Sequence, residues 1–576
     1  MPTHTYSCRQ IVGGVAEGPA LVADTRISFW GGFDPASGEI VEVGNPFEGV
    51  SIAGKVLVFR STKGSSGTSL MLRLAKMAGH APLAFINTEL DELSTLACVA
   101  LGLPLVTELD VDPFVAMQTG DIVRVDADRG VVEVSTDRPS APRVEAVSSA
   151  PSRTTIDLTP DQQAMLDGAR GDSRAEHLRL LVEWGEAVGA ERLIEVDNVL
   201  PGGLFVPNRT LGELPFELIE GYINYTKGCL IDDVGGVTAT AHASFMDLER
   251  LEQFQPDLRQ VPAQRELLDL GRKAGVSMTW TCAPYLVGNV PLSGQVCAWT
   301  ESHAVVFVNS FLAARTTRNG NESAAAAMAT GFVPEFGVLQ TENRRADFVI
   351  EVDVELTSDA DWGCLGYFAG KAGGLRIPAF TGLRSPRIES ARQLCAALAT
   401  SGGAPMLHIV GVTPEAPTLE AALRGREPDE TLTFGADELA AVYDSLTTAT
   451  DDEVDLVYFG CPHATLQEVV ELAKELRGKK VREGVTLLVS MSYAIEAQAR
   501  RLGYAEEIEA AGGRVMTDSC PSNALWREST RMATPAVKTG SYAPNLLQCE
   551  VILAPMPDCV RIAETGRWSR SAAALV

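Results

Sequence analysis

The sequence predicts an α/β protein in which a small, strand-rich N-terminal domain precedes a large α/β region built on parallel sheets. Residues 1–135 contain short apolar runs separated by glycines, a pattern typical of strands. Residues 136–157 are rich in Ser, Pro and Ala without apolar periodicity, which indicates a linker. Residues 158–576 form the large region, and near its end strand-like runs alternate with helical segments in the order βαβαβ.

Composition and charge limit the kinds of protein that this chain can be. It has 576 residues, of which 45% are hydrophobic and 21% charged, as in ordinary globular proteins. The net charge of −27 repels nucleic-acid backbones and anionic lipid surfaces, so neither partner is expected. No signal peptide and no run of about 18 apolar residues occurs, so we expect a cytoplasmic protein. Eleven cysteines without a CxxC pair favour free thiols over disulfides.

In the small domain, a strand over residues 56–59 leads through a polar loop into a helix over residues 69–77. The loop, residues 63–68 with the sequence Lys-Gly-Ser-Ser-Gly-Thr, is called the serine loop below. Its backbone N–H groups and hydroxyls precede a helix N-terminus, which favours binding of a carboxylate or phosphate. The positive electrostatic field at the helix N-terminus could also stabilise a serine alkoxide, which would allow Ser65 to act as a base. The alternative is ordinary helix capping by Ser65, Ser66 or Thr68. A hairpin is expected over residues 121–134.

The large region begins with a helix that Thr159 caps and Pro160 starts. Its C-terminal part contains strands at residues 455–459, 485–489 and 514–517, and helices at residues 466–476 and 494–502. Thr465 and Glu468 form the pattern of a capping box at the first of these helices. An alanine run at residues 324–327 is expected to form a well-packed helix.

Three cysteines follow strand-like runs in the large region. Cys282 follows residues 276–280, Cys461 follows residues 456–460, and Cys520 follows residues 514–517. Open α/β sheets bind ligands beyond the carboxyl ends of their strands, so these thiols could converge on one metal. Iron or an iron–sulfur centre would suit thiolate ligands. The alternative is that they are buried, inert thiols, as expected for Cys98 and Cys395.

Polar residues flank the apolar run at residues 304–308. Arg315 and Arg318, in a turn rich in Thr, Asn and Gly, could clamp a carboxylate, or they could belong to a solvated loop. His303 and His463 could be acid–base groups or supporting residues. Lys538 lies in a turn rich in Gly, Ser and Tyr and could bind a carboxylate or lie on the surface. No GxSxG, Walker A or GxGxxG motif occurs, so hydrolase, NTPase and dinucleotide-binding functions have no motif to support them.

These segments carry a resemblance to the aconitase X family, in the form in which a small swivelling domain is fused ahead of the catalytic region. The resemblance covers nearly the whole chain. It rests on residues 64–67, 281–286, 288–291, 301–309, 315–318, 460–463, 518–520 and 538–544. It implies an aconitase-like fold with a multi-lobed catalytic region. It also implies that Ser65 is the base, with Ser66 as the alternative. Gly67 stands where aconitase proper has an arginine.

The resemblance further implies an iron-dependent hydro-lyase acting on a small molecule. The metal ligands that it implies are Cys282, Cys461 and Cys520, holding an iron–sulfur cluster of the [2Fe–2S] type or a mononuclear iron. The substrate-binding positions that follow from it are Glu301, Ser302, His303, Asn309, Arg315, Thr316, Thr317, Arg318 and Lys538.

The resemblance to the fused bacterial branch implies that the reaction is the dehydration of cis-3-hydroxy-L-proline to Δ1-pyrroline-2-carboxylate. Ser65 would take the Cα proton and the iron would act on the 3-hydroxyl. The small domain is expected to dock over the metal-bearing region. The alternatives are another hydroxy acid such as mevalonate 5-phosphate, a non-enzymatic iron or redox sensor, and a metal-free serine hydrolase or binding protein. The sequence leaves the oligomeric state open.

Overall fold

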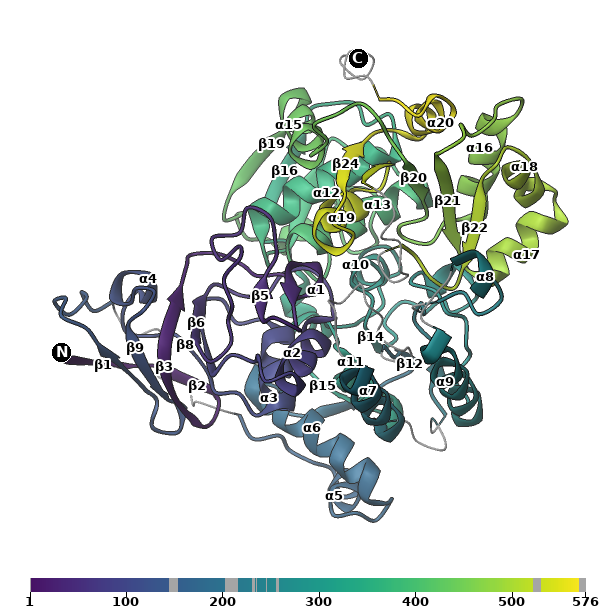
Figure 1. Cartoon of the computed structure of the whole chain (residues 1–576). Coiled ribbons are helices and arrows are strands. Elements are labelled where there is room, and N and C mark those ends of the chain that lie inside the picture. The colour runs from purple at the N-terminus through teal and green to yellow at the C-terminus, as the bar shows by residue number, and fades with distance from the viewer. Residues whose placement is uncertain are drawn as a thin grey trace.

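The computed structural model describes residues 2–144, 154–202, 216–229, 234, 236–244, 246–254, 258–521 and 530–568. It confirms the predicted fold class, because helices cover several separate sheets and three of these sheets are entirely parallel. Figure 1 shows four successive units along the chain, from the purple N-terminus to the yellow C-terminus. Within the part of the chain that the structure describes, no helix combines the length and apolar character needed to cross a membrane.

The N-terminal unit, residues 2–144, is built on an eight-stranded mixed sheet. Its elements are β1 (Thr3–Ser7), β2 (Arg9–Val12), β3 (Val15–Val22), α1 (Phe29–Gly32), β4 (Phe33–Asp34), β5 (Glu39–Ile40), β6 (Val56–Phe59), α2 (Thr68–Met77), β7 (Ala84–Asn87), α3 (Glu92–Leu101), β8 (Leu105–Thr107), α4 (Pro113–Ala116), β9 (Ile122–Asp126) and β10 (Val131–Ser135). The strand order is β1-β10-β9-β3-β6-β7-β8-β2. Strand β9 pairs antiparallel with β10, which confirms the predicted hairpin. Strand β6 and helix α2 confirm the predicted elements on either side of the serine loop.

The second unit, residues 154–342, contains a parallel sheet in the order β13-β12-β14. Its elements are α5 (Pro160–Leu166), α6 (Asp172–Val188), β11 (Leu193–Glu195), β12 (Asn198–Leu200), α7 (Phe216–Cys229), β13 (Thr238–Ala239), α8 (Leu251–Phe254), α9 (Val261–Ala274), β14 (Cys297–Trp299), α10 (Ser302–Phe311), α11 (Asn321–Thr330) and β15 (Phe332–Pro334). Thr159 caps α5 through a capping box, as predicted. The alanine run lies in the buried helix α11, also as predicted.

The third unit, residues 346–446, has a four-stranded parallel sheet in the order β18-β17-β16-β19. Its elements are β16 (Phe348–Val352), α12 (Asp359–Gly373), β17 (Pro378–Thr381), α13 (Ile388–Ser401), β18 (His408–Ile409), α14 (Leu419–Leu423), β19 (Thr431–Phe434) and α15 (Ala436–Leu446). Helices α12 and α13 pack closely because glycines remove side chains from their contact. A Cβ on Gly366 would lie 2.3 Å from the carbonyl oxygen of Leu394.

The fourth unit, residues 454–568, has a five-stranded parallel sheet in the order β22-β21-β20-β23-β24. Its elements are β20 (Leu456–Phe459), α16 (Leu466–Leu476), β21 (Thr486–Met491), α17 (Tyr493–Arg501), α18 (Tyr504–Ala510), β22 (Arg514–Thr517), β23 (Arg531–Thr534), α19 (Val537–Leu546), β24 (Glu550–Leu553) and α20 (Met556–Thr565). The predicted βαβαβ order and the capping box of Thr465 and Glu468 are both confirmed.

One predicted strand is absent. Residues 276–280, which precede Cys282, form a single bridge between Ser277 and Thr240 instead of a strand. Trp280 has a φ of 46°, a left-handed conformation that extended pairing does not allow. Cys282 is therefore carried by an irregular segment.

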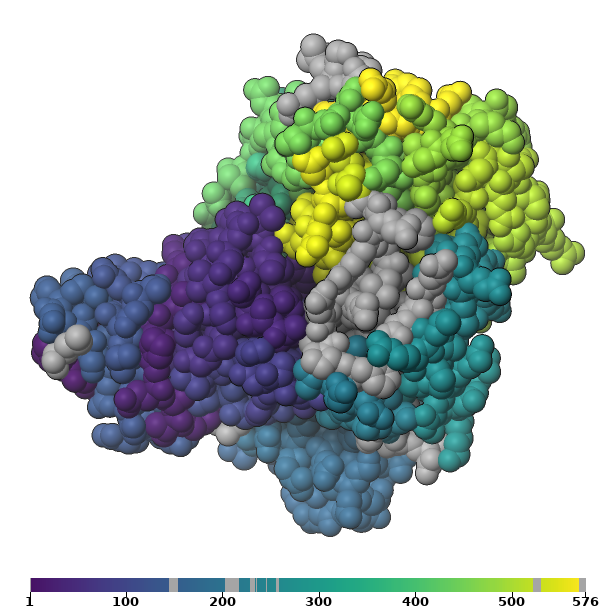
Figure 2. Space-filling view, in the orientation of Figure 1, coloured from purple at the N-terminus to yellow at the C-terminus, as the bar shows by residue number. Residues whose placement is uncertain are grey.

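The N-terminal unit is held against the other three. Ser69 on α2 donates to Glu322 on α11 over 2.5 Å, and Arg73 reaches the same carboxylate over 3.2 Å. Helix α1 contacts α19 of the fourth unit, and Figure 2 shows the purple surface meeting the yellow segment there. The predicted linker, residues 136–157, lies partly outside the described residues. The junction of the four units lies beside the serine loop.

Candidate active site

A cavity lies at the junction of the N-terminal, second and fourth units. It collects residues that are far apart in the sequence, because the ends of strands and helices from these units meet there. Its walls are formed by Trp30, Ser65, Ser66, Gly67, Leu70, Gly202, His242, Ala243, Cys282, Thr300, Glu301, His303, Asn321, Gly460, Cys461, Pro462, His463, Cys520, Lys538 and Tyr542. Most of the residues predicted for the site are among them.

The serine loop contributes Ser65, Ser66 and Gly67 to this cavity. Gly67 is the N-cap of α2 and has no side chain with which to cap the helix. The backbone N–H of Gly67 donates to Ser65 Oγ over 3.3 Å. Ser65 Oγ therefore lies at the positive end of a ten-residue helix, where negative charge on oxygen is stabilised.

The loop is fixed from outside the N-terminal unit. Arg318 donates from Nη2 to the carbonyl oxygen of Gly64 over 3.0 Å, and the N–H of Gly64 donates to the carbonyl of Gly402 over 2.9 Å. Gly64 has a φ of 82°, and a Cβ there would lie 2.8 Å from the hydroxyl of Tyr542. Two other units thus set the backbone immediately before Ser65.

Glu301 is the centre of a buried polar cluster on the opposite wall. It caps α10, and its Oε1 accepts from Lys538 Nζ over 2.6 Å and from His303 Nδ1 over 3.0 Å. Its Oε2 accepts from His242 Nε2 over 2.8 Å. Burial alone would raise the pKa of Glu301, but the charge of Lys538 and these hydrogen bonds hold it well below its usual range. Burial acts to lower the pKa of Lys538, yet the charge of Glu301 outweighs it and raises that pKa. The cluster is an ion pair, with both partners charged.

Two buried histidines are neutral at pH 7. The hydroxyl of Tyr285 donates to His303 Nε2 over 3.1 Å, and burial lowers the pKa of His303 to about 4. His463 donates from Nε2 to the carbonyl of Ser519 over 3.0 Å, and burial lowers its pKa to about 4 as well. Both rings therefore act as hydrogen-bonding groups that fix their neighbours.

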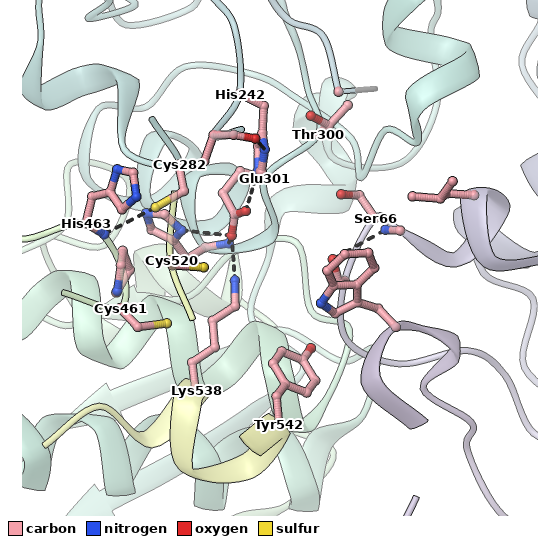
Figure 3. A pocket seen from close by; sticks show the side chains of 18 of the residues that line it. Ser66, His242, Cys282, Thr300, Glu301, Cys461, His463, Cys520, Lys538 and Tyr542 are labelled. Carbon is pink, nitrogen blue, oxygen red and sulfur yellow. Dashed lines mark hydrogen bonds and ion pairs between the residues drawn. The ribbon is translucent and has the colours of Figure 1, made fainter. Parts of the chain in front are cut away.

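The three candidate thiols lie on one side of the cavity. Cys461 follows β20, Cys520 follows β22, and Cys282 lies on the irregular segment, where its sulfur accepts from the N–H of His463 over 3.2 Å. Figure 3 shows the three thiols on one side of Glu301 and Ser66 on the other. Burial raises the pKa of the Cys282 and Cys461 thiols. The cavity thus has a sulfur side and a hydroxyl side.

These thiols have the donor chemistry of an iron–sulfur site, since soft thiolates suit such a centre. In the described structure, no three His, Cys, Asp or Glu side chains converge closely enough to hold a metal ion.

Several residues expected to bind substrate do not line the cavity. Asn309 is fully buried and donates to the carbonyls of Thr316 and Pro405 over 2.8 and 2.9 Å. The Arg315 side chain points away from the cavity and donates to the carbonyl of Leu339 over 2.7 Å. Thr316 and Thr317 are buried beside them. Arg318 holds the serine loop, as described above, and Ser302 lies behind Glu301, 3.3 Å from Lys538 Nζ.

Sequence reasoning missed His242, Trp30, Asn321 and Thr300, and it gave Tyr542 no role. His242 is one of only seven histidines in the chain and follows a short strand, so the strand-end argument could have found it. Tyr542 stands four residues after Lys538, one helical turn along α19, and the same face of that helix meets the cavity. Nothing in the local sequence around Trp30 indicates a place in the cavity.

Comparison with known proteins covers nearly the whole chain. Four family models match in order: the aconitase X swivel domain over residues 5–134, its first domain over 155–342, its second domain over 346–444 and its third domain over 454–565. A cis-3-hydroxy-L-proline dehydratase of Pseudomonas aeruginosa is 31% identical, with 98% of this chain and 97% of that protein aligned.

Two archaeal proteins match the larger part. A phosphomevalonate dehydratase large subunit of Methanothermobacter thermautotrophicus is 35% identical over 70% of this chain and 98% of that subunit. The crystal structure of Thermococcus kodakaraensis aconitase X in its holo-form matches with a TM-score of 0.61 at 31% identity. It covers 71% of this chain and 100% of that one.

Proposed function

Since the chain belongs to the aconitase X family and is a dehydratase, that is, a hydro-lyase, we propose that its substrate is cis-3-hydroxy-L-proline and its product Δ1-pyrroline-2-carboxylate. The reaction removes the Cα proton and the 3-hydroxyl as one molecule of water and leaves a double bond between Cα and C3. Transfer of the ring N–H proton to C3 then converts this enamine into the Δ1 imine. The P. aeruginosa relative named for this activity aligns over nearly its full length, whereas the phosphomevalonate relatives are separate large subunits. This chain therefore shares its single-chain organisation with the hydroxyproline dehydratase, which favours the hydroxyproline substrate.

The charge of the cavity is the observation that carries this choice of substrate. Among the described lining residues, Lys538 is the only lysine or arginine, and it is paired with Glu301 over 2.6 Å. A net-neutral pair is a poor partner for the dianionic phosphate of mevalonate 5-phosphate, which arginine clusters normally bind. A zwitterionic amino acid brings no net charge and suits such a cavity.

Ser65 serves as the base in this proposal. The N–H of Gly67 and the N-terminus of α2 stabilise negative charge on Ser65 Oγ. The hydroxyl therefore loses its proton more readily, and the alkoxide that forms can act as the base. Arg318 and Gly402 fix the backbone of Gly64, so Ser65 is held in one position relative to the opposite wall. The proton of the substrate Cα would move to this oxygen.

Lys538 is the group best placed to hold the substrate carboxylate. An ammonium has three N–H bonds, and two of them point to Glu301 and Ser302, so the third remains for a ligand in the cavity. Donation to the carboxylate also offsets the charge that develops there as the Cα proton leaves. His242 and His303 keep Glu301 ionised and in place, which fixes Lys538 in turn.

Cys282, Cys461 and Cys520 are the residues that would hold the family's iron centre. When bound there, iron supplies Lewis acidity that assists departure of the 3-hydroxyl. Gln393 donates to the carbonyl of Cys461 over 3.1 Å, and His463 donates to Cys282 Sγ, so backbone and sulfur are both oriented by neighbours.

The test is anaerobic incubation of the iron-loaded enzyme with cis-3-hydroxy-L-proline, following pyrroline-2-carboxylate. We expect turnover by the wild type, loss of turnover in Cys461→Ser, and retention in Cys8→Ser, a half-buried thiol of the N-terminal unit outside the cavity. Turnover of mevalonate 5-phosphate but not of the hydroxyproline would overturn the proposed substrate and leave the dehydratase class intact.

A further inference from the structure

We propose that the indole of Trp30 is the subsite for the cationic ring nitrogen of the substrate. The inference rests on the proposed function, because it assigns a role to the secondary ammonium of a proline derivative. It makes Trp30 a specificity-determining residue on the hydroxyl side of the cavity.

Trp30 lies where a ligand beside the serine loop would meet it. It lines the cavity together with Ser65, Ser66 and Gly67, and it is half-buried between the core of the N-terminal unit and that of the fourth unit. Its side chain comes from α1, which contacts α19, the helix that carries Lys538 and Tyr542. The indole therefore faces the same space as the proposed base and the proposed carboxylate donor.

The serine loop is shaped to admit this ring. A Cβ on Gly67 would lie 2.5 Å from Cε3, 3.1 Å from Cδ2 and 3.3 Å from Cζ3 of Trp30. Real Cβ atoms do not approach carbon so closely, so only glycine at position 67 leaves room for the six-membered ring of the indole. The pairing of Trp30 with Gly67 places an aromatic surface directly against the loop that carries Ser65.

The backbone around Trp30 is fixed in an unusual course. Trp30 interrupts α1 with φ −82° and ψ 118°, and Gly31 follows with a φ of 77°. The hydroxyl of Ser28 donates to the carbonyl of Trp30 over 2.7 Å. A Cβ on Gly31 would lie 3.2 Å from Tyr542 Cδ1, so the fourth unit closes against this turn. The backbone that carries the indole is thus held by both units.

A zwitterionic substrate needs a partner for its ammonium, and the described walls offer few. Glu301 is the only carboxylate among them, and Lys538, His303 and His242 already occupy its oxygens. The face of an indole attracts a cation more strongly than any other aromatic side chain does, and the attraction grows when water is excluded. The apolar methylene groups of a pyrrolidine ring also pack well on such a surface.

The test compares two ligands that differ in one atom. L-Proline carries the ring ammonium, whereas (S)-tetrahydrofuran-2-carboxylate has an ether oxygen in its place and no positive charge. Isothermal titration calorimetry of the iron-loaded enzyme gives the ratio of the two dissociation constants without any need for turnover. The variants are Trp30→Phe, which keeps an aromatic face, and Trp30→Leu, which removes it. Trp568→Leu, at a half-buried indole outside the cavity, is the matched control.

We expect the wild type and Trp568→Leu to prefer L-proline, and Trp30→Leu to lose roughly 3- to 30-fold of that preference, with Trp30→Phe between them. A Trp30→Leu variant with the wild-type preference would overturn the subsite, as would a wild type without any preference. A wild type that shows the Trp30-dependent preference but does not dehydrate cis-3-hydroxy-L-proline would support the subsite and overturn the proposed reaction alone. The two failures are therefore distinguishable.

Discussion

Arg318 donates a hydrogen bond of 3.0 Å to the carbonyl oxygen of Gly64, the residue immediately before Ser65. The two residues belong to different units, so the position of the proposed base depends on how the N-terminal unit is docked. The Arg318 side chain is only 5% exposed, and its Nη1 lies 3.9 Å from Glu92 Oε2 of the N-terminal unit. An arginine expected to bind the substrate instead joins the two walls of the cavity.

Replacing Arg318 tests whether it acts through the loop. We expect Arg318→Lys to lower kcat by roughly 10- to 100-fold, because small displacements of a reacting group have effects of this size. KM should change little, since the side chain does not line the cavity. Steady-state kinetics separates the two constants. Arg192→Ala, which removes an exposed ion pair with Glu335, serves as the control. A large rise in KM with kcat unchanged would show direct substrate binding instead.

The two serines of the loop are expected to differ. Ser65→Ala should lower turnover by roughly 10²- to 10⁴-fold, the usual contribution of a general base, because only Ser65 Oγ accepts from the N–H of Gly67 among the described contacts. Ser66→Ala should have a much smaller effect. Exchange of the substrate Cα proton with deuterated water measures the step directly. Equal loss in both variants would contradict the assignment of Ser65 as the base.

The contact between Gly67 and Trp30 predicts a steric effect on stability. Gly67→Ala should lower the free energy of unfolding by about 1–3 kcal/mol, because the new methyl group would overlap the indole. Combining it with Trp30→Phe, which replaces the two-ring indole by a smaller single ring, should restore part of the loss. Calorimetric melting of the single and double variants measures the coupling. Strictly additive effects would show that the two residues do not meet.

The buried pair of Glu301 and Lys538 should be costly to break from either side. Their side chains are 9% and 13% exposed, so removing one partner leaves a buried charge. Glu301→Gln and Lys538→Met should each destabilise the protein by about 3–5 kcal/mol, and the double variant by less than the sum. Melting temperatures of the three variants give the comparison. A single variant as stable as the wild type would mean that the pair is solvated.

His303 predicts a loss of stability in acid. Burial lowers its pKa from 6.5 to about 4 in the folded protein, so between these values the unfolded chain binds the proton more readily. Its contribution is complete above pH 6.5 and is lost as the pH falls toward 4, by about 1.4 kcal/mol for each pH unit. Melting temperatures of wild type and His303→Gln between pH 7 and 5 should therefore converge. Parallel curves would assign the acid sensitivity to other groups.

Local patterns were enough to predict much of the fold. The apolar runs of β20, β21 and β22, the capping boxes at α5 and α16, and the hairpin of β9 and β10 all depend on neighbours within a few residues. The strand-end argument also selected Cys461 and Cys520, because the ends of parallel strands share one edge of a sheet. It selected Cys282 from a strand that does not form, since Trp280 adopts a left-handed conformation there.

The sequence by itself therefore determined the α/β class, the elements on either side of the serine loop and the strands and helices of the fourth unit, since each depends on short-range periodicity or on a run of adjacent residues. Only the tertiary structure decided that Arg318 holds Gly64, that His242 and His303 share Glu301 with Lys538, and that Trp30 fills the space beside Gly67. These contacts join residues separated by tens to hundreds of positions. They are set by how separately formed units pack against one another, and no local pattern in the chain encodes that packing.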